Sequence, residues 1–110
     1  MDLNALQARA VEMADLYDRH NTAAGRTPWT TCDLALGFAG DVGDLAKLVM
    51  AADGRREIPD AREHLAHELA DCQWAVLVLA NRYEIDLPTE FTRMTDNLER
   101  HLTHSAPQHP

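Results

Sequence analysis

The chain has 110 residues, and its 18 acidic side chains outnumber its 10 lysines and arginines, which gives a formal net charge of −8. This length supports one domain, and 45% hydrophobic with 25% charged residues excludes a chain that is disordered throughout. The negative charge repels phosphates, so we expect no nucleic-acid polymer and no anionic membrane surface as a partner.

Helices are the expected secondary structure, because alanine and leucine dominate and aromatic residues make up only 5% of the chain. Apolar residues at helical spacing, with breaker residues between them, predict four helices at 3–20, 31–52, 59–83 and 88–102. Thr30 or Thr31 can cap the second helix, and Pro88 suits the first turn of the fourth. We therefore expect an all-α fold, with a single helical domain at 1–103 and a disordered tail at 104–110.

The second predicted helix carries two carboxylates, Asp41 and Asp44, at positions i and i+3, which places both on one face. Leu45 and Leu48 share that face, so the acids interrupt an apolar stripe. The same helix contains three glycines, Gly37, Gly40 and Gly43. Each glycine costs about 1 kcal/mol inside a helix, and we interpret them as a sign that a neighbouring helix or a bulky ligand approaches closely.

The third predicted helix repeats the acidic pattern with Glu68 and Asp71, which share a face with Leu65 and Ala75. A single pair of this kind is most often a solvated face, but antiparallel packing of the two helices would bring all four carboxylates together. Four clustered carboxylates cannot all stay ionised in a core unless cations neutralise them. Oxygen ligands select a hard cation, which predicts Mg²⁺ or Mn²⁺ rather than zinc.

Residues 72–80 of the same helix are apolar on nearly every side, and a helix without a polar face must be buried all round. We expect this helix to lie at the centre of a homo-oligomer, most simply a dimer. The alternative is that it forms the central helix of a compact monomer.

The remaining candidates for substrate contacts lie outside the acidic motifs. Arg93, Asn97 and Arg100 share one side of the fourth helix and can contact phosphate or sugar oxygens, although arginines at such positions are as often ordinary surface residues. Lys47 can neutralise phosphate, but pairing with a surface acid is the favoured interpretation. Trp29 can stack on a base.

The cysteines and the lengths of the apolar runs indicate the cellular compartment of the protein. Cys32 and Cys72 lie 40 residues apart without CxxC spacing, and the first 21 residues are charged throughout, unlike a signal peptide. No apolar run reaches the roughly 18 residues that span a membrane. We expect a soluble cytoplasmic protein with reduced thiols and no membrane partner.

Together the two acidic motifs resemble those of the MazG-like all-α nucleoside triphosphate pyrophosphohydrolases, including the dCTP-pyrophosphatase branch. That family carries E-x-x-E on one helix and E-x-x-D on the next. The counterparts here are Asp41-Val42-Gly43-Asp44 and Glu68-Leu69-Ala70-Asp71, with 23 residues between the motifs. The flanking segments 36–47, 67–74, 85–87 and 93–97 are also similar, and the resemblance covers roughly 29–100.

The resemblance implies a four-helix bundle-like subunit with the MazG-like fold, assembled as a dimer or a dimer of dimers. It implies that Asp41, Asp44, Glu68 and Asp71 bind Mg²⁺, with Mn²⁺ as a substitute, and that Glu68 and Asp71 are catalytic. The implied reaction converts a nucleoside triphosphate to the monophosphate and pyrophosphate, in house-cleaning of nucleotide pools. Trp29, Lys47, Arg93, Asn97 and Arg100 are the implied substrate-binding residues.

Two competing interpretations follow from departures in the motifs. The first acidic motif has Asp where the family commonly has Glu, and Asp is one methylene shorter. The alternative function is therefore a binding or regulatory module. It would be a metal-stabilised helical homo-oligomer that is catalytically weak or inactive. The segment from His67 to Asp71 is a near miss for the H-E-x-x-H zinc helix, with Asp in the last position.

Overall fold

The computed structural model describes residues 1–104, which form four α-helices and no strand. The helices are α1 (Leu3–Ala23), α2 (Thr31–Ala52), α3 (Ala61–Arg82) and α4 (Leu87–His104). The all-α prediction is confirmed, and the predicted helix bounds agree to within a few residues. Of the predicted tail, His104 belongs to α4, and residues 105–110 lie outside the described residues.

Side-chain caps mark the starts of α1, α2 and α4, whereas α3 begins without one. Thr30 is the N-cap of α2: its Oγ1 accepts a hydrogen bond from the Asp33 amide at 3.1 Å, and Asp33 Oδ2 accepts one from the Thr30 amide at 2.9 Å. This reciprocal capping box satisfies two backbone donors that the helix itself leaves free. Asp86 caps α4 with one hydrogen bond, because its Oδ1 accepts from the Thr89 amide at 3.2 Å.

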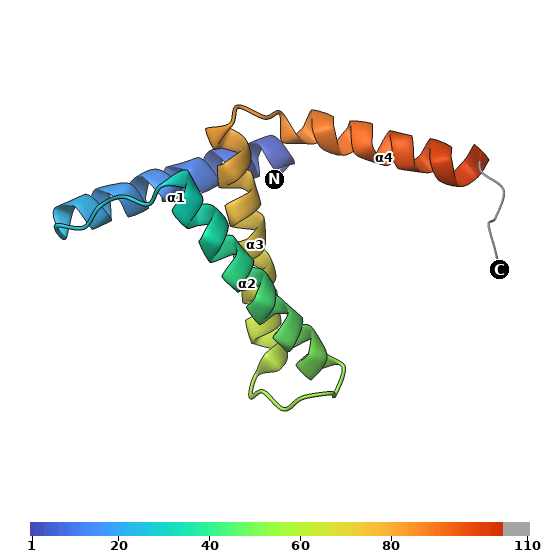
Figure 1. Ribbon diagram of the computed structural model, residues 1–110, viewed down its shortest axis with the longest axis horizontal. Coiled ribbons are helices and arrows are strands. Elements are labelled where there is room, and N and C mark those ends of the chain that lie inside the picture. Colours follow the sequence, from blue (N-terminus) through green and yellow to red (C-terminus); the bar gives the residue numbers. More distant parts are fainter. Residues whose placement is uncertain (105–110) are drawn as a thin grey trace.

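The helix α3 lies at the centre of the packed part of the molecule. It runs antiparallel to α2, and α1 crosses its C-terminal half (Figure 1). The core contains Ala10 from α1, Leu34 from α2, and Leu77 and Val78 from α3. On this side Trp74 Nε1 donates a hydrogen bond to the Ala10 carbonyl oxygen at 3.2 Å, which ties α3 to α1.

The apolar run at residues 72–80 is covered largely by α1 and α2 of the same chain. Ala75, Leu77, Val78 and Ala80 are buried, while Val76 keeps 37% of its surface exposed. Within the described residues α3 is the central helix of one chain. The prediction that it lies at the centre of a homo-oligomer stays a prediction.

The helix α4 leaves the packed part as an arm (Figure 1). Glu84 adopts a left-handed φ of 54°, and the Ile85 amide donates to the Ala80 carbonyl oxygen at 2.9 Å, which ends α3 in a tight turn. No residue of α4 is buried. The radius of gyration is 17.9 Å, against about 13 Å for a compact chain of this length. One chain by itself is therefore an open structure and not a compact monomer.

The three glycines of α2 face open space. A Cβ atom added at Gly37, Gly40 or Gly43 would meet no atom of the described chain within 4 Å. The prediction that a neighbouring helix approaches them is therefore wrong within the described chain. None of the helices in residues 1–104 is long and apolar enough to cross a membrane.

Candidate metal centre and the adjoining pocket

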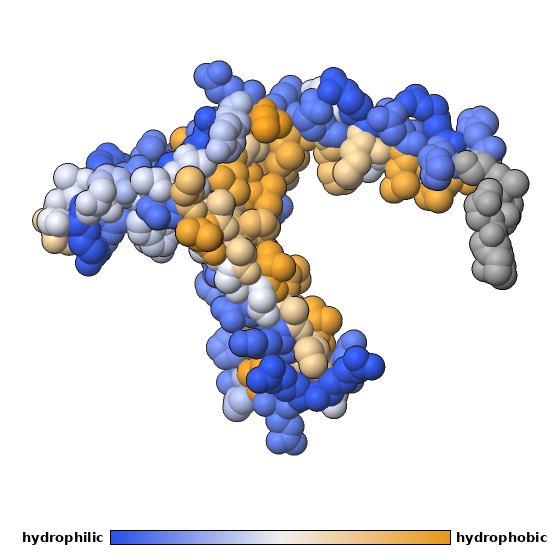
Figure 2. Space-filling view, in the orientation of Figure 1, coloured by the Kyte–Doolittle hydropathy of each residue, from blue (hydrophilic) through white to orange (hydrophobic). Residues whose placement is uncertain are grey.

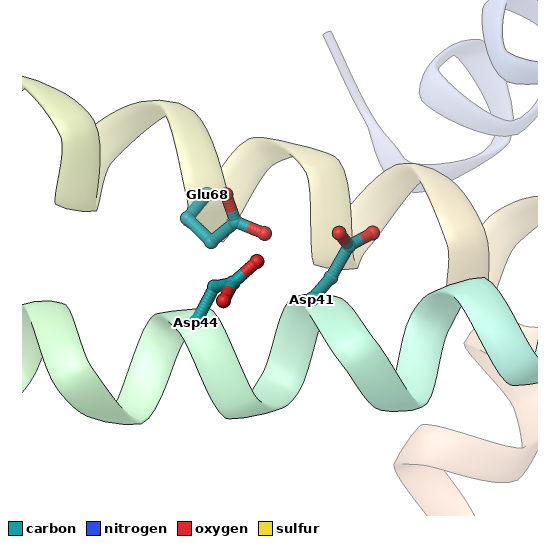
Figure 3. Close-up of side chains that lie close together, drawn as sticks. All are labelled: Asp41, Asp44 and Glu68. Carbon is teal, nitrogen blue, oxygen red and sulfur yellow. The ribbon is translucent and has the colours of Figure 1, made fainter.

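Antiparallel packing of α2 and α3 brings acids from the two motifs face to face. Asp41 and Asp44 project from successive turns of α2, and Glu68 projects toward them from α3 (Figure 3). One carboxylate oxygen of each residue lies within 4.8 Å of those of the other two. Asp41 and Glu68 are half-buried and Asp44 is exposed. We call these three residues the acid cluster.

The acid cluster carries uncompensated negative charge. Among the described residues no lysine or arginine forms an ion pair with any of the three acids. Burial raises the pKa of Glu68 above its ordinary value, and the charges of Asp41, Asp71 and Asp44 raise it further, together with a hydrogen bond to Asp41. Glu68 Oε1 is buried and has no hydrogen-bond partner among residues 1–104. An orphaned oxygen among like charges is an arrangement that a bound cation would relieve.

Asp71, the fourth predicted ligand, lies beside the acid cluster but outside the group of three. It shares a face of α3 with Glu68, and its charge contributes to the raised pKa of Glu68. Its Oδ2 lies 3.2 Å from His67 Nε2, one turn earlier on the same helix. The i, i+4 spacing brings this imidazole to Asp71. The structure thus gathers three of the four predicted acids and pairs the fourth with a histidine.

An aromatic pocket adjoins the acid cluster. It has a volume of about 450 Å³, and its lining includes Asp41, Asp71 and three aromatic side chains. Tyr17 of α1 stacks on Trp29, with ring centroids 5.6 Å apart and planes 20° apart, and lies 6.0 Å from Trp74. The flat faces of aromatic rings and two carboxylates therefore line the same pocket.

Trp29 was predicted to contact substrate, and it lines this pocket with 47% of its surface exposed. Arg82 of α3 holds the segment in place, because its Nη1 donates to the Trp29 carbonyl oxygen at 3.4 Å and to Thr31 Oγ1 at 3.3 Å. Trp74 packs against the core and also lines the pocket.

Sequence reasoning missed Tyr17. It lies within the first predicted helix, and the helical pattern does not predict which face of α1 turns toward Trp29. Only the presence of an aromatic ring in that helix could have singled it out.

The other predicted substrate-binding residues lie away from the pocket. Lys47 is exposed on α2 and makes no ion pair with a described residue. On α4, Arg93 Nη1 donates to both carboxylate oxygens of Glu90 at 2.9 Å, and Arg100 Nη2 donates to Asn97 Oδ1. None of these residues lines the pocket beside the acid cluster. Arg93, Asn97 and Arg100 lie away from it because α4 points away from α2 and α3 (Figure 1).

The residue types around the acid cluster limit its chemistry. Burial raises the pKa of the Cys72 thiol, and the nearby charges of Glu68, Asp41 and Asp71 raise it further, so the reactive thiolate form is disfavoured. The group that the structure gathers offers only carboxylate oxygens. This donor set suits Mg²⁺ or Mn²⁺ better than zinc, which favours nitrogen and sulfur.

No protein-family model, curated protein or solved structure matches the chain.

Proposed function

We propose that the protein is a Mg²⁺-dependent nucleoside triphosphate pyrophosphohydrolase of the MazG-like all-α type. It would convert a ribo- or deoxyribonucleoside triphosphate to the monophosphate and pyrophosphate, in house-cleaning of nucleotide pools. The observation that carries the proposal is the acid cluster, in which carboxylate oxygens from facing helices lie within 4.8 Å of one another and one buried oxygen lacks a partner in the described part of the chain.

The residues present fit a divalent cation. Asp41, Asp44 and Glu68 would hold it, and Asp71 lies near enough to act as a further ligand or through a water. Bound there, Mg²⁺ would supply charge neutralisation for the triphosphate and a water of lowered pKa. Manganese would substitute, because it accepts the same oxygen donors.

The protein side chains would divide the remaining tasks. Trp29, stacked with Tyr17, offers a flat face on which a base can stack. Glu68 and Asp71 would be the catalytic carboxylates, because either can accept the proton of an attacking water. The pocket joins the two tasks, since it is lined by both Trp29 and Asp71.

The predicted substrate-binding residues of α4 can reach a substrate only in an assembly of several copies. Within one chain α4 carries Arg93, Asn97 and Arg100 away from the pocket (Figure 1). We assign these three to substrate oxygens at the site of a neighbouring copy, in a homodimer or a dimer of dimers. Lys47, which lies on the same helix as Asp41 and Asp44, would neutralise phosphate charge.

A pyrophosphate-release assay tests this function. Purified protein with Mg²⁺ or Mn²⁺ is screened against the standard ribo- and deoxyribonucleoside triphosphates, with a chelator as the metal-free control. Glu68→Gln should lower turnover about 100-fold or more, as expected when a carboxylate that binds metal or accepts a proton is lost. Glu63→Gln is the matched control, because Glu63 is an exposed acid on the same helix and should leave turnover unchanged.

Two outcomes would contradict the proposal. Release of no pyrophosphate from any of these substrates removes the enzymatic function. Full turnover in Glu68→Gln means that the acid cluster is not the site.

A second function is favoured by one observation, the shorter reach of the first motif. Asp41 and Asp44 occupy positions where the family commonly has Glu, and Asp71 lies outside the group of three. A metal-stabilised binding or regulatory module needs only the cation and no turnover. Calorimetric binding of Mg²⁺ that Glu68→Gln abolishes, without pyrophosphate release by the wild type, would identify that module.

A further inference from the structure

One wall of the aromatic pocket comes from a short segment that belongs to no helix. Residues 27–29 lie between α1 and the N-cap of α2, and all three are exposed. Within residues 1–104 their backbone forms no hydrogen bond to another backbone group. We call residues 27–29 the Trp29 segment. Helix formation does not fix the position of its tryptophan, so contacts from elsewhere in the chain must do so.

Two contacts hold the Trp29 segment, one on a side chain and one on the backbone. The ring of Trp29 stacks on Tyr17 of α1. Its carbonyl oxygen accepts a hydrogen bond from Arg82 Nη1 at 3.4 Å, and the same Nη1 donates to Thr31 Oγ1 at 3.3 Å. Both bonds are long, but the donor is charged, which strengthens them. One guanidinium nitrogen thus joins the end of α3 to the Trp29 segment and to the first residue of α2.

Arg82 has no ion pair that would give it another task. It is half-buried and forms no salt bridge with a carboxylate of residues 1–104, although the chain has 18 acids. As the last residue of α3, its charge also suits the negative end of the helix dipole. That effect needs only a charge near the helix end. It does not require the bonds to acceptors that lie 53 and 51 residues earlier in the chain.

The position of the Trp29 ring matters for any flat ligand of the pocket. A side chain that is immobilised only when the ligand arrives loses conformational entropy at that moment, which weakens binding. Trp29 lines the pocket together with the carboxylates of Asp41 and Asp71, whereas Arg82 does not line it. Arg82 can therefore affect a ligand in this pocket only through Trp29.

We propose that Arg82 is a positioning residue of the pocket, whose two hydrogen bonds hold the Trp29 ring in the orientation on which a flat ligand stacks. Its loss should weaken binding without slowing the chemical step, because the ring contacts the ground state and the transition state alike. The kinetic consequence rests on the proposed hydrolase function. The orientation of Trp29 in the free protein does not.

Fluorine NMR of the full chain labelled with fluorotryptophan tests the orientation of Trp29 without any ligand. The chain has two tryptophans, and Trp29→Phe identifies the Trp29 resonance by its loss. Arg82→Gln should move this resonance toward its position in unfolded protein. The Trp74 resonance is the internal control and should move less, because Trp74 packs against the core and donates to the Ala10 carbonyl oxygen. A Trp29 resonance that stays at its wild-type position would overturn the proposal.

Two further variants separate the hydrogen bonds from the charge. Thr31→Val removes one acceptor of Arg82 but keeps the positive charge at the end of α3, so it should move the Trp29 resonance in the same direction by a smaller amount. Arg62→Gln removes a positive charge from an exposed position on α3 and should leave both resonances in place. If Thr31→Val has no effect, or Arg62→Gln acts as strongly as Arg82→Gln, the hydrogen bonds are not the cause and the proposal fails.

Circular dichroism guards against loss of the fold. All variants should keep the helix content of the wild type, because Arg82, Thr31 and Arg62 contribute nothing to the buried core. Should Arg82→Gln lose helix content, the milder Thr31→Val decides between the two outcomes by the same resonance.

Steady-state kinetics test the consequence for turnover. With a nucleoside triphosphate that the wild type hydrolyses, Arg82→Gln should raise KM about tenfold and leave kcat within about twofold, a change within the range for loss of one base–aromatic stack. A lowered kcat with an unchanged KM would contradict the positioning role. If the wild type hydrolyses none of the standard nucleoside triphosphates, the proposed function fails, and the Trp29 resonance alone decides the role of Arg82.

Discussion

At the scale of single residues, Glu68 occupies an unfavourable electrostatic position, because burial and the charges of neighbouring acids both raise its pKa. It faces Asp41 and Asp44 across the α2–α3 interface, and its Oε1 has no hydrogen-bond partner among the described residues. Folding places these like charges together without a cationic side chain to offset them. Positions that lower stability in this way are found where a ligand supplies the missing charge.

The raised pKa of Glu68 predicts a pH dependence of stability in metal-free protein. Between the ordinary value of 4.5 and the raised folded value, the folded state binds more protons than the unfolded state. The free energy of unfolding therefore falls as the pH rises through this window. The glutamine in Glu68→Gln is neutral at every pH, so its presence causes no such decrease. The free energy of unfolding of this variant should equal that of the wild type in acid and exceed it above the folded pKa of Glu68.

Urea unfolding with a chelator, followed from below pH 4.5 to neutral pH, measures this difference. Glu63→Gln controls for removal of an acid from an exposed position on α3 and should follow the wild-type curve. A difference in the free energy of unfolding between the wild type and Glu68→Gln that does not change with pH would contradict the prediction.

At the scale of secondary-structure elements, local chemistry determines most of the helix ends and little of their packing. The cap at Thr30 and the proline at 88 predict helix starts correctly, because capping bonds involve residues three positions apart. Helical periodicity also places Asp41, Asp44 and Glu68 on the faces that meet. Periodicity does not specify rotamers or crossing angles, so it predicted neither the pairing of Asp71 with His67 nor the position of Tyr17 against Trp29.

The capping box at the start of α2 is expected to contribute measurably to stability. Thr30→Ala removes the side-chain acceptor for the Asp33 amide and should lower the free energy of unfolding by about 1 kcal/mol. Urea denaturation followed by circular dichroism measures the loss. Thr27→Ala is the control, because Thr27 is exposed in the preceding loop and should change stability little. Equal losses in both variants would mean that the capping box is not the cause.

At the scale of the whole molecule, the case for a second copy rests on a different element from the one the sequence indicated. Most of the apolar run at residues 72–80 is covered by α1 and α2, although Val76 still lines an open apolar groove, whereas no residue of the amphipathic α4 is buried in its own chain. Apolar side chains recur along α4 at helical spacing and are more than half exposed, at Phe91, Met94, Leu98 and Leu102. Figure 2 shows this apolar stripe on the side of α4 that borders the open angle between α4 and the α2–α3 pair. The sequence predicts the apolar stripe of α4 but not its direction. That direction depends on the left-handed turn at Glu84, which no periodic pattern encodes.

If α4 packs on a neighbouring copy, as the proposed assembly requires, folding and association are coupled, and the melting temperature must depend on protein concentration. Mass action stabilises the dimer by about 1.4 kcal/mol for each tenfold rise in concentration. Because the unfolding entropy is that of two chains of this size, this should raise the melting temperature by about 3 °C. Calorimetry on a dilution series measures it. Leu98→Glu places a charge in the middle of the apolar stripe of α4 and should melt at one temperature throughout. A wild-type melting temperature independent of concentration would show that the stability of α1 to α3 does not depend on packing of α4 on another copy.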